Sequence, residues 1–353
     1  MKTLKEVTLA EKILKEIRIC NKCLGRQFPK FRPELSNSEK GILLKLFTIT
    51  KIKGKKQEGY TWQDLLDLTE EQNCDLCGNI FTKIDDIVAK LIERLEEYEF
   101  ENFLCGAKIP ISLVEKEEKI KSEFKLRGES LRKEIVREVG LKLNKCLKKE
   151  TNFSDPDIKI IFEPYNEEPA IRITTSPIFY SGRYLVRERG IKVKELIEEF
   201  FITNFDAESV KVTLMTVDNR LYLEMPFLVK IIHPKKRGPI NNYNDLNGVV
   251  LSELKRLSRK EYKDKEFKAE FLIKVIIDDD LTRESKISEL KENIKRKKQI
   301  VEVNFQNGVN EKEIIVIIGV CGNLNLLKMF SQSNLRVKEF KLIKIDDFKR
   351  KDI

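Results

Sequence analysis

The length, composition and charge of this sequence exclude several classes of protein. Its 353 residues are 41% hydrophobic and 36% charged with a formal net charge of +10, which allows two or three domains with real cores and favours a polyanionic partner. No run reaches the length of a membrane span, and Met1 to Ile19 alternates charged and apolar residues at helical spacing, unlike a signal peptide. We therefore expect a cytoplasmic protein with no membrane partner, whose thiols stay reduced and bind metal.

Two cysteine pairs near the start of the chain have metal-binding spacing. Cys20 and Cys23 form one C-x-x-C motif, and Cys74 and Cys77 form another. Each spacing lets two thiolates reach one ion from a tight turn, and four soft ligands suit tetrahedral zinc. Because four protein ligands leave no open coordination position, the sequence predicts a closed, structural zinc site. The alternative is unligated cysteine packed as a small hydrophobe, which gives no reason for the repeated spacing.

Capping signals and hydrophobic periodicity predict the elements of the first half. Ser36 to Glu39 has the pattern of a capping box, so a helix should begin there. The apolar spacing then predicts an amphipathic helix over 81–95, a strand over 100–111, a helix from Ser130, and strands over 158–162 and 170–184.

The second half alternates between helical and extended patterns. We expect helices over 192–201, 243–259 and 284–298, and strands over 210–212, 226–232, 267–278, 301–305, 314–319 and 337–345. Helices interleaved with strands at this spacing indicate an α+β or mixed α/β fold.

Dispersed motifs resemble the archaeal tRNA pseudouridine synthases that act on the TΨC loop. They are Cys20 to Phe28, Leu35 to Gly41, Cys74 to Ile80, Phe103 to Pro110, Glu129 to Gly140, and Ser176 to Tyr184. The resemblance implies a zinc-binding and THUMP-like RNA-binding domain over 1–190. It further implies a divergent pseudouridine-synthase-like domain with a mixed sheet over 191–353. The implied partner is tRNA, and the sequence does not indicate protein partners.

The same resemblance implies an isomerisation that needs no organic cofactor. The expected substrate is uridine 54, uridine 55 or both in the TΨC loop of tRNA. In the family, an aspartate acts on the extruded nucleoside and an arginine orients that aspartate. Asp218 lies where the family has its catalytic loop, although the stretch Met215 to Arg220 lacks the family's glycine and its preceding arginine. Arg220 is the candidate replacement, and an ordinary Asp-Asn turn is the alternative interpretation of Asp218.

An aromatic residue of the family stacks on the extruded base. Phe267, within Lys265 to Ala269, matches that position, and phenylalanine can stack on a base without donating a hydrogen bond. Tyr262 is the candidate if the register differs. A core aromatic on a strand is the alternative for either residue.

Basic residues elsewhere are candidates for RNA contacts. Lys235, Lys236 and Arg237 form one cluster of the kind that contacts phosphates without reading sequence. Arg183 and Tyr184 are secondary candidates, because their motif is equally typical of packing.

The altered aspartate loop leaves two further hypotheses open. The chain would be a non-catalytic tRNA-binding paralogue if the chemistry has been lost. It would be a THUMP-bearing partner of a separate modifying enzyme if it only delivers the RNA.

Overall fold

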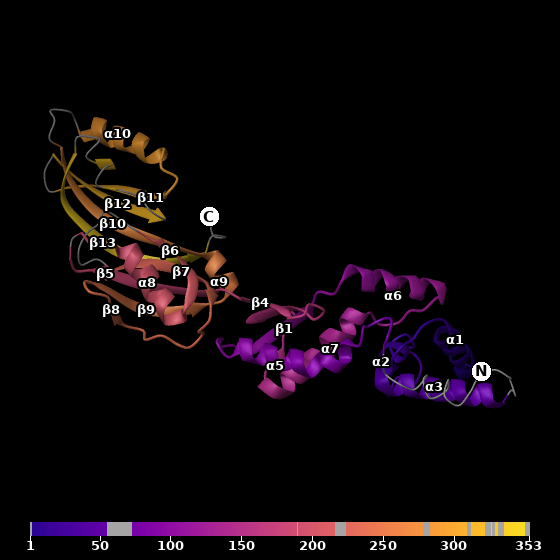
Figure 1. The fold of residues 1–353 in the computed structure, drawn as a ribbon. Coiled ribbons are helices and arrows are strands. Elements are labelled where there is room, and N and C mark those ends of the chain that lie inside the picture. The colour runs from indigo at the N-terminus through magenta and orange to yellow at the C-terminus, as the bar shows by residue number, and fades with distance from the viewer. Residues whose placement is uncertain are drawn as a thin grey trace. The chain divides into compact units, whose positions relative to one another are not determined.

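The computed structural model describes residues 2–54, 73–188, 190–215, 224–277, 283–308, 312–321, 326, 329–330 and 335–349. The chain divides into two compact units, Met1–Thr175 and Ser176–Ile353 (Figure 1). The resemblance implied a division at residue 190. The difference arises because the extended run predicted over 170–184 is interrupted at Ser176 and Pro177, and its second half pairs with strands of the second unit.

The first unit combines helices with a small sheet. Its helices are α1 (Lys2–Glu16), α2 (Asn21–Gly25), α3 (Asn37–Gly54), the 3-10 helix η1 (Ile80–Lys83), α5 (Ile84–Leu95), α6 (Ile111–Glu123) and α7 (Leu131–Leu147). Its strands are β1 (Asn102–Ala107), β2 (Glu150–Thr151), β3 (Ile158–Glu163) and β4 (Ala170–Thr175). One hydrophobic core runs through the whole unit.

The sheet of the first unit has the strand order β2-β1-β3-β4. Strand β1 is parallel to β2 and β3, whereas β3 and β4 are antiparallel. Every second residue of β1 and β3 is buried, as expected for strands with one face on a core. Helix α7 packs on this sheet, and a Cβ at Gly140 would lie 3.4 Å from Cys105 Sγ on β1.

Helices α2 and α3 touch through their backbones at two glycines. A Cβ at Gly25 would lie 1.8 Å from Asn37 O, and a Cβ at Gly41 would lie 2.0 Å from Asn21 O. Only glycine allows this approach, because any side chain would overlap main-chain atoms that cannot rotate away. The contact brings α2, with Cys20 as its N-cap and Cys23 within it, against the start of α3.

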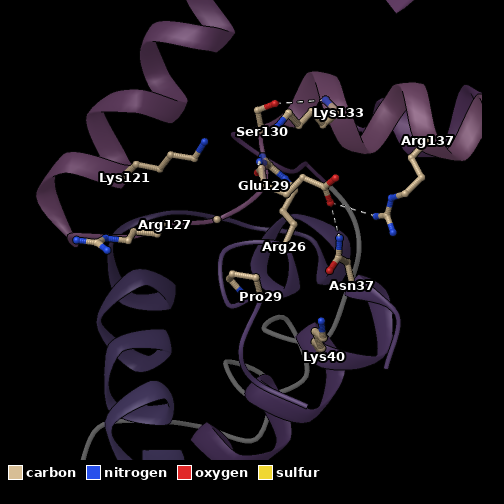
Figure 2. Close-up of a pocket in the computed structure, with 11 residues that line it drawn as sticks. Arg26, Pro29, Asn37, Lys40, Lys121, Arg127, Glu129, Ser130, Lys133 and Arg137 are labelled. Carbon is tan, nitrogen blue, oxygen red and sulfur yellow. Dashed lines mark hydrogen bonds and ion pairs between the residues drawn. The ribbon is translucent and has the colours of Figure 1, made fainter. Parts of the chain in front are cut away.

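Side chains cap the helices where the sequence predicted. Ser36 N donates to Glu39 Oε2 at 2.8 Å, and Glu39 N donates to Ser36 Oγ at 3.3 Å, which confirms the capping box before α3. Ser130 Oγ accepts a hydrogen bond from Lys133 N at 3.3 Å at the start of α7 (Figure 2).

The described residues of the second unit form two antiparallel sheets. Its strands are β5 (Ile178–Val186), β6 (Ala207–Leu214), β7 (Glu224–Pro234), β8 (Asn244–Asp245), β9 (Val249–Leu257), β10 (Lys265–Ile277), β11 (Ile300–Asn307), β12 (Glu313–Cys321) and β13 (Leu335–Lys349). Its helices are α8 (Val193–Phe205), α9 (Arg259–Asp264) and α10 (Arg283–Lys295). The sheet orders are β6-β7-β5-β9-β8 and β11-β12-β10-β13.

Helix α8 covers the first of these sheets with aromatic side chains. Phe201 and Phe205 are buried, and both rings lie within 6 Å of the Tyr180 ring on β5, at 5.6 and 5.7 Å between centroids. The mixture of helices and several sheets across the two units confirms the predicted α+β class. None of the described helices combines the length and apolar composition that a membrane span requires.

The helix predicted over 243–259 is wrong. This stretch forms β8 and β9, and β9 pairs antiparallel with β5. Val250, Leu254 and Leu257 have the three-to-four-residue spacing of a helix face, which explains the error. The strand forms because it satisfies the main-chain groups of β5 and buries Val249 and Leu251 in the core.

Candidate functional site

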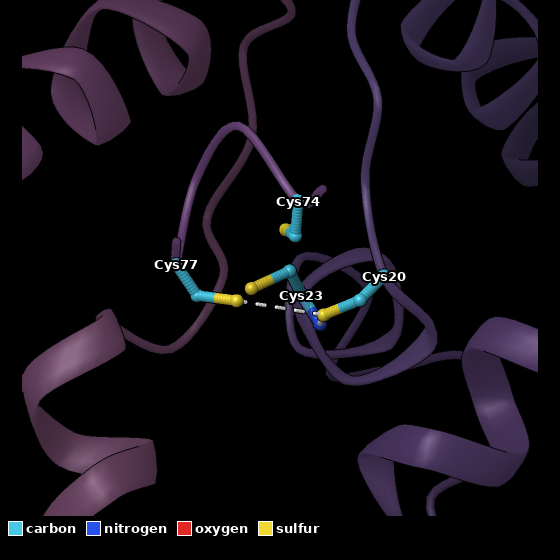
Figure 3. Close-up of side chains that lie close together, drawn as sticks. All are labelled: Cys20, Cys23, Cys74 and Cys77. Atoms are coloured by element: carbon cyan, nitrogen blue, oxygen red, sulfur yellow. Dashed lines mark hydrogen bonds between the residues drawn. The ribbon is translucent and has the colours of Figure 1, made fainter. Parts of the chain in front are cut away.

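The four cysteines of the two C-x-x-C motifs converge on one point (Figure 3). Their Sγ atoms all lie within 4.8 Å of one another, and Cys20 Sγ is 3.8 Å from Cys77 Sγ. A tetrahedral zinc with Zn–S bonds of about 2.3 Å places its sulfur ligands about 3.8 Å apart. All four side chains are buried, so the residues present fit a closed metal site.

Local backbone geometry presents the sulfur atoms. Cys20 caps α2, and its Sγ accepts from Cys23 N at 3.4 Å. The second pair sits on a tight turn, in which Gly78 N donates to Cys74 O at 2.9 Å. Gly78 and Asn79 have φ values of 53° and 60°, the left-handed region that glycine and asparagine tolerate best. Asn79 Oδ1 also accepts from Cys74 N at 2.8 Å, which fixes the turn.

Four buried and adjacent cysteine thiolates would need a cation to compensate their charge. Burial raises the pKa of Cys23, and contact with Cys20 raises the pKa of Cys77. Contacts with the other sulfur atoms lower the pKa of Cys74, so the thiols titrate as a group. Four adjacent thiolates repel one another in a buried site unless a positive ion compensates them.

A buried arginine connects this cluster to the rest of the unit. Arg26 Nη2 donates to Cys23 Sγ at 3.6 Å, and its guanidinium forms an ion pair with Glu117 on α6. Burial opposes the charge on Arg26, but Cys23 and Glu117 outweigh that effect and raise its pKa. Glu117 Oε2 in turn accepts from Leu131 N at 2.9 Å. On the other side, Tyr165 in the β3–β4 turn donates its hydroxyl to Cys77 O at 2.9 Å.

Sequence reasoning did not assign roles to these supporting residues. Arg26 falls inside the Cys20 to Phe28 motif, which is a signal for its importance but not for its partner. Glu117 lies on α6, which was not predicted as a helix. Its partner is 91 residues away in the chain, so no local pattern could reveal the pair.

Asp218 and Arg220 lie outside the described residues, and the structure describes only the two strands that lead to them. β6 and β7 pair antiparallel, with Leu214 opposite Phe227, as the predicted strands around the loop require. Met215 N donates to Pro226 O at 3.0 Å, and Tyr184 donates its hydroxyl to Met215 O at 2.9 Å. The base of the 216–223 connection is thus anchored to the core.

The two candidate stacking aromatics are both half-buried in the second unit. Tyr262 on α9 packs its ring 4.5 Å from the Phe179 ring, measured between centroids. Phe267 lies on β10, and Lys265 Nζ is 5.3 Å from the centre of its ring. Which of them contacts a base stays a prediction.

The candidate RNA contacts differ in their surroundings. Tyr184 is 5% exposed and belongs to the core, so packing and the Met215 hydrogen bond account for it. Arg183 forms an ion pair with Glu253, with Nε 2.7 Å from Oε2. In the basic cluster, Lys236 is exposed, whereas Arg237 Nη1 donates to Ser176 O at 3.0 Å and Lys235 Nζ lies 4.0 Å from Asp206 Oδ2.

Comparison with known proteins finds a match to part of the first unit. Residues 87–163, which run from within α5 to the end of β3 and include β1, α6, α7 and β2, match the family described as the archaeal Pus10 THUMP domain. A solved structure of the acetolactate synthase small subunit from Thermotoga maritima covers 50% of this chain at 15% identity. Its TM-score of 0.19 is too low to bear on the fold.

Several archaeal proteins named tRNA pseudouridine synthase Pus10 are similar along much of the chain. The protein of Pyrococcus furiosus is 30% identical over 65% of this chain and 58% of its own length. That of Methanopyrus kandleri is 26% identical over 64% of this chain and 62% of its own length. That of Vulcanisaeta distributa is 25% identical over 84% of this chain and 81% of its own length.

The chain spans about three fifths of the first two of these relatives. The matches confirm the resemblance predicted from the dispersed motifs. Residues 87–163 thus resemble the archaeal Pus10 THUMP domain, and the chain as a whole is similar to archaeal proteins named tRNA pseudouridine synthase Pus10.

Proposed function

We propose that this protein is a tRNA pseudouridine synthase that isomerises uridine 54, uridine 55 or both in the TΨC loop. The observation that carries the proposal is the similarity to proteins of that name, which extends beyond the THUMP domain in the Vulcanisaeta relative to 84% of this chain. The first unit would hold tRNA, with a structural zinc at Cys20, Cys23, Cys74 and Cys77. The second unit would carry the chemistry.

The proposed reaction balances without a cofactor. The N1–C1′ bond of uridine breaks, C5 becomes joined to C1′, and one proton leaves C5 while N1 gains one. Asp218 would act on the nucleoside as a carboxylate, with Arg220 beside it to favour the ionised form. Phe267 or Tyr262 would stack on the extruded base. Lys235, Lys236, Arg237 and Arg183 would contact RNA phosphates.

Asp218→Asn tests this assignment because it keeps the shape of the side chain and removes its charge. We expect pseudouridine formation to fall by at least about a thousandfold, as for loss of the central catalytic group, while tRNA affinity changes little. The assay is purified protein with an unmodified tRNA transcript, followed by chemical mapping of pseudouridine. Asp245→Asn, at an exposed ion pair with Arg187, is the matched control and should retain full turnover.

The altered loop favours one alternative, a non-catalytic tRNA-binding paralogue. The stretch Met215 to Arg220 lacks the glycine of the family's loop and the arginine that precedes its aspartate. Tight tRNA binding without turnover by the wild-type protein would establish this alternative. Equal turnover by wild type and Asp218→Asn would instead refute the role of Asp218.

A further inference from the structure

A basic pocket lies next to the cysteine cluster and is lined by residues of both the N-terminal helices and the THUMP domain (Figure 2). Its cavity volume is about 570 Å³. It lies wholly within the first unit, between the start of α3, the end of α6 and the start of α7. Six of its lining side chains are cationic: Arg26, Lys40, Lys121, Arg127, Lys133 and Arg137. Glu129 is the one carboxylate among the described lining residues.

Carboxylates in or beside the pocket pair with three of these cations. Arg26 pairs with Glu117, and Lys121 Nζ lies 3.4 Å from Oε1 of both Glu117 and Glu118. Arg137 pairs with Glu134 and also with Glu129, whose Oε2 is 3.3 Å from Nη2.

The other three cations, Lys40, Arg127 and Lys133, have no carboxylate within ion-pair distance among the residues that the structure describes. Arg127 and Lys133 are exposed at the rim. The pocket therefore has an excess of positive charge.

Lys40 is the unusual member of this set. It is 6% exposed, and in the described part of the chain its amino group has neither an ion pair nor a hydrogen bond. Figure 2 shows the amino group on the side of Asn37, toward the other lining residues. Burying an ammonium without a partner costs free energy, so such a residue is retained where an anion compensates it.

Two helix N-termini add to the positive potential. α3 begins at Asn37 and α7 at Leu131 after its Ser130 cap, and both Asn37 and Ser130 line the pocket. The helices have 18 and 17 residues, long enough for the partial charge at their first turns to favour an anion.

We propose that this pocket binds a phosphate group of tRNA, with Lys40 as its buried counter-ion and Arg127 and Lys133 at the rim. The inference rests on the proposed tRNA binding and adds a location for it. Since none of the described lining residues is aromatic, the pocket offers no stacking platform and suits the sugar–phosphate backbone rather than a base. The phosphate could be an internal phosphodiester or the 5′ end.

The decisive variant is Lys40→Met, which keeps the length of the side chain and removes its charge. We expect its affinity for unmodified tRNA transcript to fall about tenfold, and the slope of log affinity against log salt to decrease by about one. Its Tm should equal or exceed that of the wild type, because an uncompensated buried charge is gone. Lys145→Met, exposed in the last turn of the same α7 that borders the pocket, is the control and should leave affinity unchanged.

A second variant, Arg127→Ala combined with Lys133→Ala, removes only exposed side chains and keeps the test valid if Lys40→Met unfolds. It should also weaken binding and lower the salt slope. Transcripts with a 5′-phosphate or a 5′-hydroxyl distinguish the terminal phosphate from an internal phosphodiester. If the pocket variants lose affinity only for the 5′-phosphate transcript, the pocket binds the terminal phosphate. If they lose affinity equally for both transcripts, it binds an internal phosphodiester.

Each remaining outcome has a distinct meaning. Normal tRNA binding by both pocket variants would refute the pocket and leave the proposed function intact. Failure of the wild-type protein to bind tRNA would refute both.

Discussion

At the scale of single residues, the Arg26–Glu117 pair decides how the first unit responds to acid. Both side chains are almost fully buried. Burial alone would raise the pKa of Glu117, but the charge of Arg26 and the hydrogen bond from Leu131 N lower it below its ordinary value of 4.5. A carboxylate with a lowered folded-state pKa stabilises the protein above about pH 4.5, and this contribution is lost as the pH falls through the folded-state pKa.

We therefore expect Glu117→Gln to lower the free energy of unfolding by about 3–5 kcal/mol at neutral pH, since the buried Arg26 loses its carboxylate partner. The difference from wild type should shrink below pH 4.5. Urea denaturation at a series of pH values measures both effects. Glu118→Gln on the same helix is the control, because Glu118 is largely exposed and its pair with Lys121 contributes little. A pH-independent difference would contradict this account of the pair.

At the scale of elements, the contact between α2 and α3 depends on glycine. We expect Gly25→Ala to destabilise the protein by about 3 kcal/mol or more, because the added Cβ overlaps Asn37 O and the helices must separate. The separation would also disturb the cysteine cluster, since Cys20 caps α2 and Cys23 lies within it. Thermal unfolding and metal content are the measurements.

Gly106→Ala provides the matched comparison for this substitution. Gly106 lies on β1, and a Cβ there would have no atom within 4 Å. Alanine also loses less backbone entropy on folding than glycine, so this variant should be neutral or slightly stabilising. Similar stabilities of the two variants would show that the close approach of α2 and α3 is not required.

At the scale of the whole molecule, the two units should depend differently on metal. We expect purified protein to contain about one zinc per chain, held by the four cysteines. Removing it with a chelator should unfold much of the first unit, because metal-binding free energy at a structural site is folding free energy. The second unit has its own hydrophobic core and should stay protected. Hydrogen exchange resolved along the chain measures both responses.

Two cysteine substitutions sharpen this test. Cys77→Ser should lose the metal and reproduce the effect of chelation. Cys146→Ser should retain it, because Cys146 is exposed on α7 and is not part of the cluster. Metal-free protein in which the first unit remains fully protected would rule out a structural zinc.

Features that depend on short-range spacing could be predicted from the amino-acid sequence. Two C-x-x-C motifs identified the four sulfur atoms that meet in the structure, because the spacing within each pair sets the turn geometry. Ser36 and Glu39 identified the start of α3 for a similar local reason. The dispersed motifs predicted the similarity to the archaeal pseudouridine synthases that the comparisons found, while the roles of Asp218, Arg220 and Phe267 remain predictions.

Features made by residues far apart in the chain could not be predicted, because no local pattern records which distant segments pack together. Arg26 and Glu117 are 91 residues apart, and Lys40, Arg127 and Lys133 line one pocket only because distant segments of the first unit pack together. The stretch 249–257 has helical spacing, yet it pairs with β5, since a neighbouring strand's unsatisfied main-chain groups outweigh a weak local preference. Strand β5 likewise belongs to the β6-β7-β5-β9-β8 sheet of the second unit. Its partners are β7 and β9, which begin at Glu224 and Val249, and the residues of β5 alone do not reveal this pairing.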